Sequence, residues 1–193
     1  MKQSIQLSDH FTYGRLLRFT LPSIGMMIFT SIYGVVDGFF VSNFAGKTAF
    51  AAINLIMPLL MIFSTVGFMF GTGGSALVAK TLGEGDKEKA NRYFSLFVYV
   101  CAALGIVFTV IGMFIAPPVA EALGAEGQML HDAVLYSRII LAALPFGVLQ
   151  LLFQSFMITA EKPMLGLWVT VSSGVTNMVM DAVLVTLLPQ EWK

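Results

Sequence analysis

Five long apolar stretches follow one another along the chain, and short segments rich in charged residues separate them. The uncharged stretches cover residues 19–36, 48–79, 93–120, 139–160 and 163–180. A helix needs roughly 18 or more predominantly apolar residues to cross a bilayer. The pattern therefore predicts an all-α membrane protein with about five transmembrane helices, over residues 16–41, 49–79, 93–116, 133–160 and 164–188.

The composition agrees with this pattern. Hydrophobic residues make up 57% of the chain and charged residues 11%, and the mean hydropathy is +0.83, whereas soluble domains carry about 25% charged residues. We therefore expect a multi-pass protein of the cell membrane, with the lipid bilayer as its first partner. Residues 1–15 are expected to form a cytoplasmic or interfacial segment, residues 16–188 the helical part, and residues 189–193 a short tail.

The basic residues predict the orientation of the helices. With the N-terminus inside, eight of the 11 Lys and Arg residues lie on the cytoplasmic side: Lys2, Arg15, Arg18, Lys80, Lys87, Lys89, Arg92 and Lys162. The outer side then holds only Lys47, Arg138 and Lys193. Because cytoplasmic loops are enriched in Lys and Arg, we expect the N-terminus to lie in the cytoplasm.

The motifs of enzymes and metal sites are missing from the sequence. His10 and His131 are predicted on opposite sides of the membrane, and Cys101 is the only cysteine, so these residues do not predict a metal site. The GEGD segment at residues 83–86 follows no strand and stands between two spans, which favours a tight turn over a phosphate-binding loop. We expect a protein without catalytic residues, metal ligands, an organic cofactor or a nucleic-acid partner.

Two acidic residues lie within the apolar spans. Asp37 has no charged neighbour between Arg18 and Lys47, and Asp181 has a similar setting in the last span. A carboxylate at such a depth costs about 2.5–3.5 kcal/mol on insertion scales and usually marks an ion or proton pathway. In the predicted orientation Asp37 lies about 6 Å and Asp181 about 10 Å before the outer ends of their helices. Two acids at nearly the same level favour coupled transport.

Polar and small residues recur at helical spacing around these acids. Residues on the same face as Asp37 are Ser23, Thr30 and Gly34, and those on the same face as Asp181 are Thr170, Ser173 and Asn177. Similar stripes contain Gly147, Gln150 and Gln154 in the fourth span, and Asn54, Pro58, Met61, Thr65 and Thr72 in the second. Such stripes occur at ordinary helix contacts, but packing does not require a carboxylate. We therefore expect a hydrated cavity beside both acids, in which Asn177 is placed to hydrogen-bond either of them.

Glycine and proline residues mark two further features of the spans. The pairs Gly34–Gly38 and Gly67–Gly71 have the GxxxG spacing that permits two helices to approach closely. Pro22, Pro58 and Pro145 lie within predicted helices, where proline removes a backbone hydrogen bond.

Several segments, in chain order, carry a family resemblance. They are residues 21–22 (LP), 33–46 (YGVVDGFFVSNFAG), 51–58 (AAINLIMP), 71–76 (GTGGSA), 82–86 (LGEGD) and 177–181 (NMVMD). This ordered set resembles the beginning of multidrug and toxic compound extrusion (MATE) transporters. The resemblance implies that Asp37 is the first-helix aspartate that carries protons in the DinF-like branch. It also implies that Asp181 and Asn177 complete the cation-binding site.

The family resemblance also implies a larger protein. Its members have about twelve spanning helices in two six-helix lobes, whereas this chain has 193 residues and five predicted spans. We therefore expect an incomplete N-terminal lobe whose partner is a C-terminal lobe from the same gene or a separate chain. The residues expected to line the substrate cavity are Thr30, Tyr33, Gly34, Asn54, Met61, Gln150, Gln154 and Ser173.

The function expected from these features is cation-coupled antiport. Either H⁺ or Na⁺ is the coupling ion, and the exported compounds are amphipathic and often cationic organic molecules, such as drugs. One alternative is a related flippase for a lipid-linked oligosaccharide, which is expected to need bases for pyrophosphate, but Arg138 is the only base near a span interior. The other alternative is a non-transporting fragment or an assembly subunit.

Overall fold

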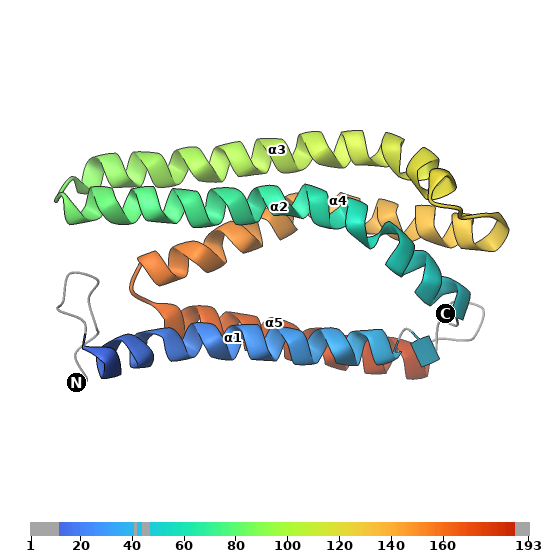
Figure 1. Cartoon of the computed structure of the whole chain (residues 1–193), viewed down its shortest axis with the longest axis horizontal. Coiled ribbons are helices and arrows are strands. Elements are labelled where there is room, and N and C mark those ends of the chain that lie inside the picture. Colours follow the sequence, from blue (N-terminus) through green and yellow to red (C-terminus); the bar gives the residue numbers. More distant parts are fainter. Residues whose placement is uncertain (1–11, 41, 44–46, 188–193) are drawn as a thin grey trace. The chain divides into compact units, whose positions relative to one another are not determined.

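The computed structural model describes residues 12–40, 42–43 and 47–187, with side chains described as far as residue 184. Five helices make up this part of the chain: α1 (Tyr13–Phe40), α2 (Lys47–Gly83), α3 (Lys87–Ala122), α4 (Gly127–Thr159) and α5 (Pro163–Leu187) (Figure 1). Most of the expected N-terminal segment, the predicted span ends at Val41 and Leu188, and the tail at residues 189–193 lie outside the described residues.

The predicted all-α fold with five membrane helices is confirmed. All five helices are long and apolar enough to cross a membrane. Helices α2 and α3 extend beyond the apolar spans into the charged segment that separates them, because Lys, Glu and Arg are themselves good helix formers. Lys80 lies 3.9 Å from Glu84, and Arg92 lies 2.7 Å from Glu88, each one helical turn apart.

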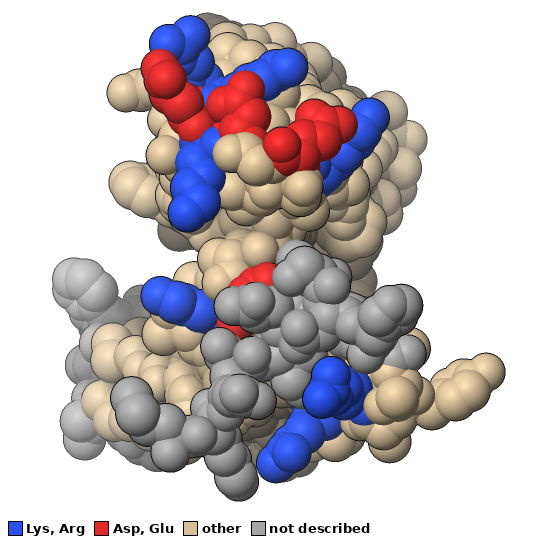
Figure 2. All heavy atoms as spheres, turned by 90° about the vertical axis from the view of Figure 1, so that its left-hand side faces the viewer, with Lys and Arg blue, Asp and Glu red and all other residues tan. Residues whose placement is uncertain are grey.

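The connection between α2 and α3 is a tight turn. Gly85 has a φ of +87°, which glycine adopts at little cost. The side chain of Asp86 accepts a hydrogen bond from the backbone N–H of Lys89 at 3.0 Å and caps the start of α3. Basic and acidic side chains gather at this end of the α2–α3 hairpin (Figure 2). The segment serves as a turn, as the sequence suggested.

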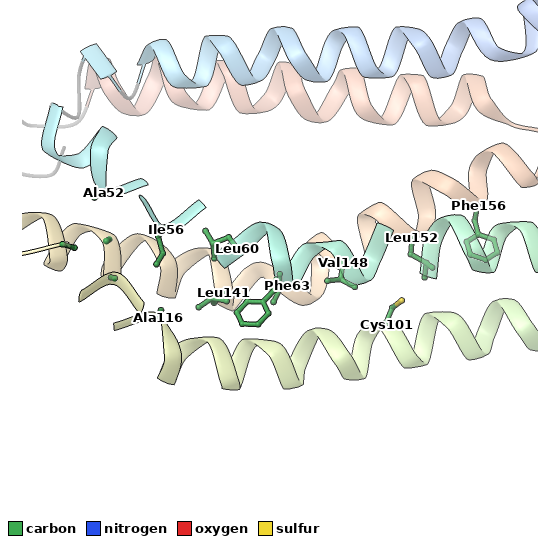
Figure 3. Packing of buried hydrophobic residues seen from close by; sticks show 14 of the residues in the cluster. Ala52, Ile56, Leu60, Phe63, Cys101, Ala116, Leu141, Val148, Leu152 and Phe156 are labelled. Atoms are coloured by element: carbon green, nitrogen blue, oxygen red, sulfur yellow. The ribbon is translucent and has the colours of Figure 1, made fainter. Parts of the chain in front are cut away.

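The helices form two compact units. One unit is Ala51–Thr159, which contains most of α2 and all of α3 and α4, and the other contains α1 and α5. The core of the first unit is a continuous apolar cluster in which Ile56, Leu141, Val148 and Leu152 are fully buried (Figure 3). Cys101 lies in the same cluster, and its thiol is fully buried.

Close contact between α2 and α4 depends on Gly67 and Gly71. A Cβ at Gly67 would lie 2.6 Å from the backbone oxygen of Val148, and one at Gly71 would lie 2.8 Å from Oγ of Ser155. Residues further along α2 meet residues further along α4, so these two helices run in the same direction (Figure 1). This GxxxG pair thus makes the close approach that its spacing permits.

The close approach that the spacing of Gly34 and Gly38 permits is not made by the described residues. A Cβ added at either position would meet no described atom within 4 Å. The contact of α1 with α5 is made on a different face, where Gly174 of α5 lies against the ring of Phe29 and Gly25 of α1 lies against Leu167. Both α1 and α2 carry a GxxxG pair, but among the described residues a neighbouring helix packs closely against only the pair in α2.

Helices α1 and α5 run in parallel. The contact of Gly25 with Leu167 is followed along both helices by that of Phe29 with Gly174. The chain therefore runs in the same direction in both helices, as Figure 1 shows. In a parallel pair, residues at corresponding levels of the two helices remain adjacent, and this register determines which side chains meet further along.

Candidate functional site

The parallel register brings the carboxyl groups of Asp37 and Asp181 together. The two side chains, both half-buried, lie within hydrogen-bonding range of each other. An ionised carboxylate only accepts hydrogen bonds, so a hydrogen bond between two carboxyl groups requires a proton on one of them. The Oδ2 atom of Asp181 is buried, and no hydrogen-bond donor reaches it among the described residues. The pair is therefore an acidic centre that a proton or another cation would complete.

The polar stripe of α1 lies to one side of the face that contacts α5. Phe29 is on the contact face. At about 100° per residue, Asp37 lies about 80° from Phe29 around the helix, Thr30 about 100° and Gly34 about 140°, all in the same sense. Thr30 and Gly34 are exposed, and Asp37 lies closest to the contact with α5.

The polar stripe of α5 is displaced in the opposite sense. Relative to Gly174 on the contact face, Asp181 lies about 20°, Asn177 about 60° and Ser173 about 100° around the helix. In two parallel helices that face each other, opposite senses of rotation from the contact line lead to the same side of the pair. Both stripes therefore line one side of the α1–α5 unit, and they converge at Asp37 and Asp181.

Two other predicted residues of this unit lie next to the acids. Tyr33 is half-buried one turn before Asp37, and its ring centroid lies 6.5 Å from that of Phe29. Asn177 is exposed one turn before Asp181. The hydrogen bond expected between Asn177 and one of the acids is not found among the described side chains. Phe29 was not predicted from the sequence, because an aromatic residue in an apolar span carries no polar signal.

The remaining predicted residues belong to the unit formed by α2, α3 and α4. Asn54 and Met61 lie on an exposed face of α2, where Met61 is 65% exposed. On α4, Gln150 is exposed and Gln154 is half-buried. The polar stripe of α2 also includes Thr65, whose hydroxyl donates to the backbone oxygen of Met61 at 2.8 Å. This bond within one helix satisfies the hydroxyl without a partner helix.

The acids do not form part of a larger group of metal ligands in the described ranges. No set of three His, Cys, Asp or Glu side chains within residues 12–40, 42–43 and 47–184 is placed to hold a metal ion. What the α1–α5 unit offers is a pair of adjacent carboxyl groups with neutral polar side chains on the same side. Such a pair can exchange a proton or bind a monovalent cation through oxygen atoms.

Comparison with known proteins agrees with this arrangement of helices. The family model MatE matches residues 22–183. The chain is 24% identical to the multidrug export protein MepA of Staphylococcus haemolyticus over 184 residues, covering 95% of this chain and 41% of the relative. It is 25% identical to a MepA protein of Staphylococcus aureus over 170 residues, covering 88% of this chain and 38% of the relative. The chain thus spans about two fifths of the length of these curated relatives.

Solved structures show the same fold. A crystal structure of a MATE protein in the straight conformation has a TM-score of 0.81 at 23% identity, covering 86% of this chain and 37% of the other. A transporter of the MOP superfamily from Pyrococcus furiosus has a TM-score of 0.82 at 23% identity, covering 88% and 37%.

These matches account for most of the chain. The five apolar helices correspond to the N-terminal half of MATE transporters, which are membrane transporters and not enzymes. The expected fold and its membrane setting are therefore confirmed. With a family model that covers residues 22–183, this chain belongs to the MatE family.

Proposed function

We propose that the chain is the N-terminal part of a drug exporter in which Asp37 and Asp181 together bind the coupling cation. The observation that carries the proposal is the contact between the two carboxyl groups. The polar stripes on one side of α1 and α5 support it, because they give a cation a polar route to the pair. The name of the relatives, multidrug export protein MepA, supports export of drugs as the direction of transport.

The charge of the acid pair provides a mechanism for antiport. A bound proton or Na⁺ neutralises part of the charge on Asp37 and Asp181, and its release restores that charge. A cationic organic compound is attracted to the unneutralised pair, so cation and compound compete for the same negative charge. Each ligand then favours a different state of the protein, which is the thermodynamic requirement for exchange.

The coupling ion is either H⁺ or Na⁺. A proton needs only the shared contact between the two carboxyl groups, whereas Na⁺ needs several oxygen ligands. Asn177 offers an amide oxygen one turn from Asp181. We assign Asp37 to the role of the first-helix aspartate of the DinF-like branch, as the resemblance implies, and keep both ions open. Transport driven by an imposed pH gradient at constant Na⁺ would distinguish the proton.

The proposed set of substrate-binding residues extends beyond the acids and takes residues from each of the two units. Its members share polar, small or methionine side chains and lie on exposed or half-buried positions: Thr30, Tyr33, Gly34, Asn54, Met61, Gln150, Gln154 and Ser173. Methionine and aromatic side chains adapt to ligands of different shape and attract cations. We place the N-terminus in the cytoplasm, and we propose that the chain works together with a C-terminal lobe, because alternating access rocks one repeat against the other.

Efflux measurements test the proposed role of the acid pair. The chain is joined to a C-terminal MATE lobe, and export of a fluorescent organic cation is driven by an imposed pH or Na⁺ gradient. Asp37→Asn and Asp181→Asn should each abolish gradient-driven export, and the double variant should be no worse than either single variant, because residues that act as one unit are non-additive. Ser23→Ala, on the same stripe, should export at nearly the parental rate.

The two alternatives give different results in the same assay. If both single Asn variants export at the parental rate, the acids are structural and the proposed coupling is wrong. A flippase would transport a lipid-linked sugar and not the organic cation. A non-transporting subunit would export neither compound after the second lobe has been supplied.

A further inference from the structure

Arg138 is a charged residue on an apolar, exposed face of α4. Its neighbours on this face are Leu135, which is 52% exposed, and Ile139, which is 61% exposed. The core face of α4 carries Ser137 and Leu141, both fully buried, which lie about 100° and about 60° from Arg138 around the helix, on the other side of Arg138 from Leu135 and Ile139. Arg138 is itself exposed, so its side chain points away from the helices of its own unit.

The position of Arg138 along α4 is next to the apolar stretch that crosses the bilayer. Helix α4 has 33 residues, which makes it about 50 Å long, whereas the hydrocarbon layer is about 30 Å thick. The uncharged stretch 139–160 begins directly after Arg138. At 1.5 Å per residue it is about 33 Å long and is enough to cross this layer, so Arg138 lies at the boundary of the layer, at the end nearer to Gly127. Helical side chains tilt toward the N-terminus of their helix. The guanidinium group is thereby directed to the nearer membrane surface, where a long basic side chain can reach the headgroups.

Arg138 has no anionic partner among the described residues. The nearest acid along α4, Asp132, lies about 120° away around the helix. It accepts a hydrogen bond from Gln128 at 2.8 Å and lies 3.6 Å from Nδ1 of His131. Arg92, the other arginine on a helix of this unit, is paired with Glu88 at 2.7 Å. A charge at the boundary of the hydrocarbon layer, without a partner in its own unit, is available to an anionic group of another molecule.

We propose that Arg138 binds the phosphate group of an anionic phospholipid in the leaflet nearer to the N-terminal end of α4. The guanidinium group donates paired hydrogen bonds to the phosphate oxygens, a geometry that suits arginine. Leu135 and Ile139 contact the acyl chains of the same molecule. An ion without acyl chains would make no apolar contact with Leu135 and Ile139, and a neutral lipid would provide no counter-charge for Arg138. The surface is thus a lipid site, separate from the acid pair on α1 and α5.

Lipid binding to the purified chain tests this assignment. The chain is titrated in detergent with phosphatidylglycerol, and bound lipid is counted by native mass spectrometry. Arg138→Gln should bind phosphatidylglycerol about tenfold more weakly, since a hydrogen bond to a charged group contributes about 1.5 kcal/mol or more. Arg138→Lys should retain part of the affinity, and Arg92→Gln, which removes an arginine already paired with an acid, should bind like the parental chain.

Two further measurements distinguish an anionic phospholipid from a free anion as the source of the counter-charge. Diacylglycerol, which lacks the phosphate, should bind equally weakly to the parental chain and to Arg138→Gln, and inorganic phosphate should not displace bound phosphatidylglycerol. Equal binding of phosphatidylglycerol by the parental chain and Arg138→Gln would overturn the proposal, as would displacement by inorganic phosphate.

A measurement on the parental chain covers the case in which Arg138→Gln does not fold. A phosphatidylglycerol with a photoreactive group near its headgroup should label peptides that contain residues 131–142, and the matching diacylglycerol should not. Labelling confined to other helices, or cross-links between two copies of the chain at this face in place of lipid, would contradict the lipid site.

Discussion

The hydroxyl of Thr109 on α3 donates to the backbone oxygen of Leu141 on α4 at 2.7 Å, and it shares its single proton with the backbone oxygen of Gly105, one turn earlier on α3, at 2.9 Å. In an unbroken helix this oxygen would accept from the backbone N–H four residues later. That position is Pro145, which has no N–H to donate. Thr109 therefore supplies the missing donor from the neighbouring helix, and Gly105 allows the approach, since a Cβ there would lie 2.8 Å from Cα of Pro145.

We predict that Thr109→Val destabilises the chain because Leu141 loses this donor. The cost should be about 0.6 kcal/mol and at most about 1.7 kcal/mol, the range for hydrogen bonds between membrane helices. Thr109→Ser should be close to neutral. In a Pro145→Ala background, residue 145 donates to Leu141, so Thr109→Val should cost less. The free energy of unfolding in detergent is measured for the parental chain and the four variants, and an equal cost of Thr109→Val in both backgrounds would contradict the link.

A second prediction concerns the close contact of α2 with α4. Gly67→Ala should lower the unfolding temperature, because the new Cβ meets the backbone oxygen of Val148, which cannot rotate away. Overpacking costs about 1–3 kcal/mol, and the better helix propensity of alanine returns up to about 1 kcal/mol. Gly73→Ala is the matched control on the same helix, since no described atom lies within 4 Å of its Cβ. It should be neutral or stabilising.

A third prediction separates the contact face of α1 and α5 from the face that carries the polar stripe. Gly174→Ala places a methyl group against the ring of Phe29 and should weaken the α1–α5 pair. Gly34→Ala should leave the stability of the chain unchanged or raise it, because its Cβ meets no described atom within 4 Å. Both variants are compared by thermal unfolding in detergent. A larger loss from Gly34→Ala would mean that the contact face has been wrongly assigned.

A fourth prediction concerns orientation. In a chain whose Cys101 has been replaced by alanine, single cysteines at Thr48 and Gln128 should react with an impermeant thiol reagent from outside intact cells. A cysteine at Gly85 should react only after the membrane has been opened. The expected pattern follows from the excess of basic residues on the side of the N-terminus. If the cysteine at Gly85 reacts in intact cells, the orientation is the reverse of the predicted one.

Sequence periodicity predicted the helices because a span is a property of one segment. The same periodicity showed that Asp37 and Asp181 each end a polar stripe, since it defines the faces of a helix. It does not show which helix covers a face. Gly34–Gly38 and Gly67–Gly71 have the same spacing, yet only the second pair meets a neighbouring helix among the described residues. Likewise, the link from Thr109 to Leu141 depends on the pairing of α3 with α4, which no local pattern encodes.

The parallel packing of α1 against α5 has a consequence for the synthesis of the chain. Three complete helices separate them in sequence, and a protein is built from its N-terminus. Asp37 therefore enters the membrane long before Asp181 has been translated. During that interval the first helix carries an acid whose partner does not yet exist. The carboxyl pair can form only after α5 has been made, and it is therefore among the last features of this region to assemble.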